Sequence, residues 1–453
     1  MTSEVMVEFK GDGGGTGELT WGQRDMWMSM RRTTHTMNIG GAMGLPPGTT
    51  VDDMTATLRF LVSRHPALRT RLKFFGGAEF PLQEVSESGS VGLTVVDAED
   101  DPDGDPASAA ERLRAEFEAK PFDHAAEWPV RMGVIRSGAT LSHVVVQYSH
   151  MVIDGGGIAA LGRDLSRKDT GEPPAPGFTP LELVSWQRSA AGLRQNEKSL
   201  RHWESQLRRI PRETYLGGPV EPRFWELLCY SPALHLALQA IAARTGADTG
   251  HALLAAYAVA IARVSGVSPS ATHVVVSNRF RPLLGDAVTQ LTQRGICVID
   301  VAGCSFDEVV TRAWKASTAA SLHSYCDPVP RDSLVAQILP GLDLSNFIND
   351  RRVPSAAACE LSPASLREAL DRTVRRWDRK QSAYNGRLFL QVDSRPDINA
   401  PGRAAEAGAG EPAVYYAIWA DSHYLAPAAV EAFAAELEAA AVGAAFDGAR
   451  RAL

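Results

Sequence analysis

The stretch Ser149-His150-Met151-Val152-Ile153-Asp154-Gly155 lies between a run typical of a strand and a run typical of a helix. Residues 141–148 are almost continuously apolar, which predicts a strand in the interior of a sheet. Residues 158–165 predict a helix, which the preceding glycines open. This order places His150 in a turn at the end of a buried strand. An imidazole held there can take a proton from a nucleophile near neutral pH, so His150 is the candidate general base.

The bulk composition is that of a soluble globular protein. The chain has 453 residues, enough for two domains, and is 45% hydrophobic and 22% charged. Its net charge of −7 argues against a nucleic-acid-binding surface and against a basic helix on a membrane surface. We see no signal peptide and no apolar run of transmembrane length. The sequence therefore predicts a cytoplasmic protein that binds neither nucleic acid nor membrane.

The cysteines point to neither a disulfide framework nor a metal site. Their number is odd and no pair has Cys-x-x-Cys spacing. We expect reduced, mostly buried thiols. The five cysteines are Cys229, Cys297, Cys304, Cys326 and Cys359.

Strands and helices alternate in both halves of the chain, which predicts two similar α/β lobes. The Pro- and Gly-rich residues 170–180 are the predicted boundary, giving lobes 1–175 and 176–453. In the second half, a predicted strand at residues 273–276 leads into a segment that contains Arg279 and Arg281.

Several motifs, in the same order over nearly the whole chain, resemble those of the condensation domains of nonribosomal peptide synthetases. That family belongs to the superfamily of chloramphenicol acetyltransferase. The matching segments are residues 19–27 (Leu-Ser-x-x-Gln-x-x-x-Trp in the family), 64–71 (Arg-His-x-x-Leu-Arg-Thr), 121–123, 149–155 (His-His-x-x-x-Asp-Gly) and 323–328 (His-Gln-x-x-Pro). The chain departs from the pattern at Ser149, which stands at the first histidine of the doublet, and this indicates a divergent branch.

The resemblance implies an α/β fold of two chloramphenicol-acetyltransferase-like lobes that form a V-shaped pseudo-dimer, with the active site between them. It implies transfer of an acyl or peptidyl group from a carrier-protein thioester to a small-molecule amine, forming an amide, with His150 promoting the attack. No metal and no tightly bound cofactor are expected. The donor would be linked to phosphopantetheine on a separate acyl or peptidyl carrier protein, or to coenzyme A.

The resemblance also suggests roles for the residues around His150. Asp154 and Gly155 would be structural, with Asp154 paired to an arginine. Arg279 is the candidate partner because it follows a strand that should lie beside the motif, and Arg281 is the second choice. Gly156, at the start of a helix, is a candidate oxyanion contributor. Tyr148 and Ser149 are candidates for lining the acceptor channel.

Other functions stay open at this point. A coenzyme-A-dependent or ester-forming acyltransferase of the same superfamily would use the same base. A noncatalytic condensation-like domain that recruits another enzyme would keep the fold, although such domains usually lose the His or Gly that this chain retains. A serine hydrolase is disfavoured, because adjacent residues such as Ser149 and His150 point to opposite sides of an extended chain.

Overall fold

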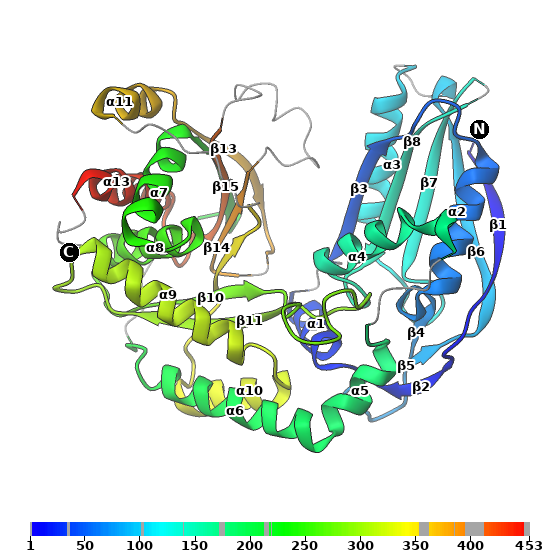
Figure 1. The fold of residues 1–453 in the computed structure, drawn as a ribbon, viewed down its shortest axis with the longest axis horizontal. Helices are drawn as coiled ribbons and strands as arrows, with labels where there is room; N and C mark the ends of the chain where they lie inside the picture. Colours follow the sequence, from blue (N-terminus) through cyan, green and yellow to red (C-terminus); the bar gives the residue numbers. More distant parts are fainter. Residues whose placement is uncertain are drawn as a thin grey trace. The chain divides into compact units, whose positions relative to one another are not determined.

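The structure is a computed structural model, and it describes residues 2–33, 37–100, 104–138, 140–171, 177–212, 217–218, 220–352, 362–384, 386–394 and 412–447. The chain forms two compact units. Unit 1 contains Met1–Arg194 together with Ser277–Gln293, and unit 2 contains Gln195–Val276 together with Arg294–Leu453. Each unit has a sheet with helices against it (Figure 1), which confirms the predicted α/β class.

The boundaries of the two units differ from those of the predicted lobes, which are 1–175 and 176–453. The first part of unit 1 ends at Arg194 and not at residue 175, because α5 (Pro180–Arg188) packs within unit 1. Gln187 on this helix accepts a hydrogen bond from the Trp21 backbone N–H at 3.1 Å. Within the second predicted lobe, Ser277–Gln293 returns to unit 1. Nothing local in the sequence indicates that return.

The main sheet of unit 1 has five strands, and β8 lies between β7 and β3 in it. In sheet order the strands are β1 (Thr2–Lys10), β6 (Ser88–Asp97), β7 (Val130–Ser137), β8 (Thr140–Ser149) and β3 (Asn38–Gly44). Both neighbours of β8 run antiparallel to it, and Tyr148 pairs with Val130 on one side and Ile39 on the other. The strand predicted from the apolar run at 141–148 is therefore confirmed as an interior strand.

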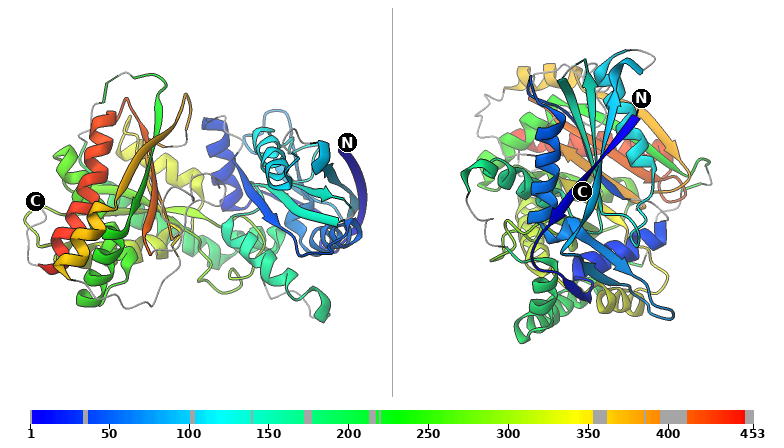
Figure 2. Two further views of the ribbon diagram at one scale, coloured as in Figure 1. Left: turned by 90° about the horizontal axis from the view of Figure 1, so that it is seen from above. Right: turned by 90° about the vertical axis from the view of Figure 1, so that its right-hand side faces the viewer.

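Helices cover both faces of this sheet (Figures 1 and 2). The side chains of Ile135 and Val145 belong to the small core beneath α3 (Pro106–Ala119). Their neighbours Val134 and Val144 point the other way, into the larger core beneath α2 (Val51–Arg64) and α4 (Gly155–Leu165). Each such buried side chain contributes about 1.5–3 kcal/mol, so both faces hold β8 in place.

The remaining elements of unit 1 are smaller. They are the three-stranded sheet of β2 (Gly15–Glu18), β5 (Leu82–Val85) and β4 (Thr70–Lys73), helix α1 (Trp21–Thr33), and the 3₁₀ turns η1 (Pro66–Arg69), η2 (Ala98–Asp100) and η3 (Lys168–Thr170). Helix α6 (Ala190–Leu207) starts in unit 1 and continues into unit 2.

Unit 2 is built on a seven-stranded sheet. In sheet order the strands are β11 (Gln293–Ile299), β10 (Ser270–Val276), β12 (Asn346–Asp350), β14 (Leu388–Asp393), β15 (Val414–Asp421), β9 (Phe224–Ser231) and β13 (Val374–Gln381). The helices are α7 (Pro232–Thr245), α8 (Thr249–Ser265), α9 (Phe306–His323), α10 (Pro328–Ile338), α11 (Pro363–Asp371) and α13 (Pro427–Phe446). Helices α7, α8 and α13 share one hydrophobic core with the sheet (Figure 2). Every residue of α8 from Ala252 to Ala262 is buried, as its uniformly apolar sequence predicts.

Four cysteines, Cys229, Cys297, Cys304 and Cys326, are free and buried, as predicted, whereas Cys359 lies outside the described residues. Among the residues with described positions, no helix has the length and apolarity needed to cross a membrane. The same part of the chain holds no cluster of His, Cys, Asp or Glu side chains placed to bind a metal ion.

The return of Ser277–Gln293 to unit 1, called here the crossover segment, places backbone against helix α1. Gly22 of α1 lies so close to this segment that an added Cβ would collide with the carbonyl oxygen of Gln290. We expect Gly22→Ala to lower the free energy of unfolding by about 1–3 kcal/mol, since a backbone atom has to shift. Urea denaturation of both proteins measures the loss.

Gly162→Ala is the matched control, since Gly162 is also helical and an added Cβ there would meet nothing within 4 Å. It should be neutral or stabilising by up to about 1 kcal/mol. An unchanged stability in Gly22→Ala would show that the crossover segment does not pack on α1.

Candidate functional site

His150 lies in the turn between β8 and α4, as the sequence predicts. Its backbone N–H donates to the Met37 carbonyl at 3.2 Å, and the N–H of Ser149 donates to the Pro129 carbonyl at 3.0 Å. These two bonds tie the end of β8 to the segments that flank β3 and β7. The turn itself closes through the Val152 N–H, which donates to the Ser149 carbonyl at 3.1 Å. The backbone at His150 is thus fixed on both sides.

The imidazole of His150 is half-buried. Burial lowers its pKa below the usual value, and the negative charge of Asp154 opposes that effect. The ring is therefore neutral at pH 7 and can accept a proton. Its Nδ1 atom is buried and makes no hydrogen bond within the part of the chain that the structure describes.

The hydroxyl of Ser149 is directed to partners other than His150. His124 Nε2 lies 2.8 Å from Ser149 Oγ, and the Met151 N–H donates to the same oxygen at 3.3 Å. Ser149 is fully buried. His124 was missed by sequence reasoning. Its only signal was its position next to the motif at 121–123, which says nothing of a contact with residue 149.

The carboxylate of Asp154 joins α4 to the crossover segment. Asp154 caps α4 by accepting the Gly157 N–H at 2.7 Å on Oδ1. The same oxygen accepts Arg279 Nη2 at 2.6 Å. Its Oδ2 accepts the N–H groups of Leu291 and Thr292, at 2.9 and 2.8 Å, and the Thr292 hydroxyl at 2.9 Å. The structure therefore has the predicted Asp154–Arg279 pair.

This carboxylate is ionised although it is almost completely buried. Its side chain is 1% exposed. Burial alone would raise the pKa of Asp154, but the charge of Arg279 and the donated hydrogen bonds hold it below the usual 3.8. The second candidate, Arg281, stacks over the Phe280 ring at 5.2 Å instead.

Arg279 also organises the crossover segment. Its Nη1 donates to the Ala287 carbonyl at 2.7 Å, and its Nη2 to the Thr289 carbonyl at 3.2 Å. Gly156 packs directly on this guanidinium, because an added Cβ would collide with Arg279 Nε. Glycine is thus required at 156 for packing, whereas an added Cβ at Gly155 would meet nothing within 4 Å.

Tyr148 lies in the hydrophobic core of unit 1 with 7% of its surface exposed. Burial raises the pKa of its hydroxyl. The structure thus brings Ser149, His150, Asp154 and Arg279 into one region of unit 1, and Tyr148 lies in the core of the same unit. The roles predicted for these residues, and for Gly155 and Gly156, stay predictions.

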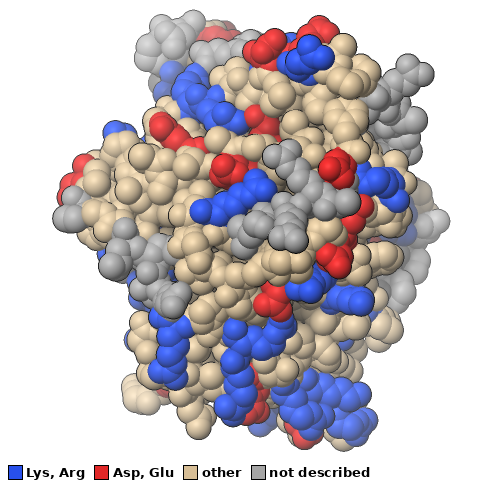
Figure 3. Space-filling view, turned by 90° about the vertical axis from the view of Figure 1, so that its left-hand side faces the viewer, with Lys and Arg blue, Asp and Glu red and all other residues tan. Residues whose placement is uncertain are grey.

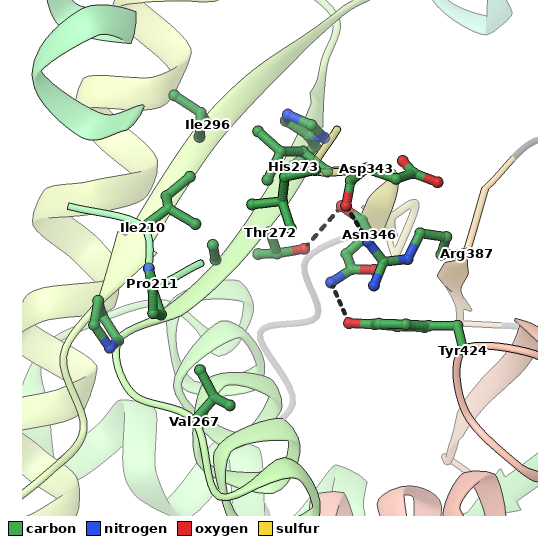
Figure 4. A pocket seen from close by; sticks show the side chains of 14 residues that line it. Ile210, Pro211, Val267, Thr272, His273, Ile296, Asp343, Asn346, Arg387 and Tyr424 are labelled. Atoms are coloured by element: carbon green, nitrogen blue, oxygen red, sulfur yellow. Dashed lines mark hydrogen bonds between the residues drawn. The ribbon is translucent and has the colours of Figure 1, made fainter. Parts of the chain in front are cut away.

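A separate pocket lies in unit 2, between the start of β10 and the end of β15 (Figure 4). Thr272 Oγ1 donates to the Asn346 carbonyl at 3.2 Å, and Asn346 Nδ2 donates to Tyr424 Oη at 3.1 Å. The Arg387 guanidinium lies 3.6 Å from the centre of the Tyr424 ring. These contacts link β10, β12 and the turn after β15, and none of them involves a residue of the His150 region.

The buried ion pair makes a first prediction for the site. Asp154→Asn removes the negative charge and replaces one accepting carboxylate oxygen by an NH₂ group. Arg279 then keeps an uncompensated buried charge. We expect a loss of about 3–5 kcal/mol in unfolding free energy at pH 7. Because folding lowers the pKa of Asp154, its contribution is present above the unfolded value of 3.8 and is lost as the pH falls through the folded-state pKa. Urea denaturation at a series of pH values should show the two proteins converging below pH 3.8.

Asp286→Asn is the matched control. Asp286 also pairs with an arginine between α4 and the crossover segment, accepting from Arg163 Nη2 at 2.6 Å, but its side chain is 39% exposed. An exposed pair contributes less than about 1 kcal/mol. Equal losses in the two variants would contradict the assignment of Asp154 as the central contact.

Known proteins match this chain in sequence and in fold. Residues 15–325 match the model of the condensation-domain family. The chain is 28% identical over 298 residues to phosphinothricin tripeptide synthetase PhsC of Streptomyces viridochromogenes, a match that covers 61% of this chain. It covers 27% of PhsC, so the chain spans about a quarter of that relative.

Two solved structures share the fold over almost the whole chain. SgcC5 from Streptomyces globisporus has a TM-score of 0.69 at 18% identity, covering 96% of this chain and 100% of that one. The X-domain from teicoplanin biosynthesis, solved in complex with OxyB, has a TM-score of 0.67 at 19% identity, covering 96% and 94%. The match to condensation-domain structures confirms the predicted chloramphenicol-acetyltransferase-like fold of two lobes.

Proposed function

Because the chain belongs to the condensation-domain family of nonribosomal peptide biosynthesis, we propose that it is an acyltransferase that forms an amide from a thioester and an amine. The observation that carries the proposal is the state of His150. Its backbone is tied to both flanking segments, and its half-buried ring has a lowered pKa. A neutral imidazole fixed at the end of a strand suits general-base catalysis.

In the proposed reaction the amine nitrogen attacks the thioester carbonyl. The new C–N bond forms, the C–S bond breaks, and the thiol leaves. His150 accepts the proton that the attacking nitrogen loses and can return it to the departing sulfur. The transfer is direct, so no acyl group becomes attached to the protein.

The start of α4 would stabilise the charge that develops on the carbonyl oxygen. The first N–H groups of a helix have no partners within the helix. Asp154 satisfies the N–H of Gly157, which leaves those of Gly155 and Gly156 at the helix terminus. We assign Gly156 as the oxyanion donor on this basis. Asp154 and Arg279 then act as positioning residues, since they fix the turn between His150 and the helix.

The donor would be an acyl or peptidyl group on the phosphopantetheine of a carrier protein. Coenzyme A could present the same thioester, and a hydroxyl acceptor would give an ester by the same proton transfer. Tyr148 and Ser149 are proposed as residues that line the acceptor channel and not as catalysts, because Tyr148 is in the core and Ser149 is bonded to His124. A recruitment role is the second candidate, favoured by the likeness to a domain solved in complex with OxyB.

His150→Ala tests the proposal in the organism that carries the gene. A deletion strain would be complemented with wild type or with the variant, and metabolites compared at equal protein level. General-base catalysis contributes about 10²–10⁴-fold in rate. We therefore expect the product to fall below about 1% of wild type, with a precursor accumulating that lacks the acyl or amine part.

His143→Ala, a partly exposed histidine on the same strand β8, is the matched control and should restore the product. Full restoration by His150→Ala would exclude catalysis by this residue and would favour recruitment. Mass spectrometry of the accumulated precursor identifies the missing part.

A further inference from the structure

Unit 2 has a hollow between α6 and α9, with β11 as its floor. Its cavity volume is about 310 Å³. The residues that line it are His202, Gln206, Arg209, Val298, Asp300, Arg312, Lys315, Ala316 and Ala319. All of them belong to unit 2, whereas His150, Asp154 and Arg279 belong to unit 1. The hollow is therefore distinct from the site of the proposed function.

Positive charge dominates this hollow. Arg209, Arg312 and Lys315 line it, against the single carboxylate of Asp300. That carboxylate accepts Arg209 Nη2 at 3.0 Å, and the backbone carbonyl of Asp300 accepts Arg312 Nη1 at 3.1 Å. Across the described portion of the chain, Lys315 has no hydrogen bond or ion pair. Two of the three positive charges thus have no carboxylate opposite them within the hollow.

The surrounding helix surface is also basic, although the whole chain carries a net charge of −7. Lysine and arginine gather along the lower edge of the face in Figure 3, where Figure 1 has α6. Exposed Lys198, Arg201 and Arg208 lie on this helix or directly after it. Arg201 and Arg208 are paired with glutamates one turn away, so their charges are largely neutralised on the helix itself.

The other polar groups of the hollow are suited to an anion. Gln206 already accepts Arg209 Nη1 at 2.7 Å, which leaves its amide N–H₂ as a donor. His202 stacks on His323 with ring centres 4.7 Å apart. Burial and the neighbouring His323 lower the pKa of His202 to about 4. The imidazole is neutral at pH 7, and an anion placed beside it would raise that pKa.

We propose that the hollow between α6 and α9 is a binding site for the phosphate group of a small ligand. Arginine and lysine together are the usual protein ligands of phosphate. A cavity volume of about 310 Å³ lies at the lower end of the range for small-molecule sites and is larger than a single phosphate needs. The apolar side chains of Val298 in the floor and of Ala316 and Ala319 in the α9 wall can contact an uncharged part of the ligand.

The test uses the whole chain and two probes, inorganic phosphate and coenzyme A. The signals of ¹³C-labelled histidine would be followed by NMR, with His202 assigned through His202→Gln. We expect phosphate to raise the pKa of His202 from about 4 towards the ordinary value of 6.5. Coenzyme A binding more tightly than phosphate would identify a nucleotide-bearing ligand, and equal binding would identify phosphate itself.

Lys315→Ala and Lys198→Ala form a matched pair, since both lysines are exposed on helices of unit 2 and only Lys315 lines the hollow. We expect Lys315→Ala to weaken phosphate binding roughly tenfold, and Lys198→Ala to leave it unchanged. His150→Ala should also leave it unchanged, which separates this site from the proposed function. The inference is overturned if His202 does not respond to phosphate up to about 10 mM, where even a millimolar site is mostly filled. Equal weakening in the two lysine variants would overturn it as well.

Discussion

Asp154 keeps its negative charge inside unit 1, where 1% of its side chain is exposed. Removing an ion from water costs several kcal/mol, so the surrounding chain has to supply opposite charge and hydrogen bonds in good geometry. It does so from two places far apart in sequence: the first turn of α4, and the crossover segment with Arg279, Leu291 and Thr292. The start of α4 and the crossover segment can therefore adopt their positions only together. The turn that carries His150 lies directly before Asp154 and takes its direction from this arrangement.

The other end of α4 is held by a second carboxylate. Asp164 is buried and pairs with Arg64 Nε at 2.7 Å, at the last residue of α2, and with His65 Nε2 at 2.9 Å, directly after that helix. Burial lowers the pKa of His65, and Asp164 opposes that shift. A helix held at both ends by charged groups cannot tilt without breaking one of them. Arg64 and His65 thus help to position the loop of His150 by holding the far end of α4, although they are about 85 residues away in sequence.

Much of this arrangement could be predicted from sequence, and the limits have physical causes. The apolar run at 141–148 and the glycines at 155–157 indicate strand, turn and helix, since their signals are local. The Asp154–Arg279 pair could be predicted because Arg279 follows a strand, although the sequence alone left Arg281 as a second choice. The contact of His124 with Ser149 could not, because it depends on the register of two strands and on a loop that only the folded unit brings together. The same holds for the division of the chain. The Pro- and Gly-rich composition of residues 170–180 predicts a lobe boundary, but the helix that follows this stretch is bonded to Trp21 in unit 1 through Gln187.

The crossover segment makes the His150 region depend on residues from the second half of the chain. It leaves unit 2 after β10 and returns at β11, two strands that are neighbours in one sheet, so both of its ends are fixed by unit 2. Its middle completes the hydrogen bonds of Asp154 in unit 1. Residues 1–194 alone therefore contain His150 and helix α4. Of the five hydrogen bonds that Asp154 accepts in the described structure, these residues supply only the one from the Gly157 N–H. The other four come from Arg279, Leu291 and Thr292 in the crossover segment. The geometry around His150 is thus a property of both halves of the chain, and the match of the family over residues 15–325 extends far enough to include the crossover segment.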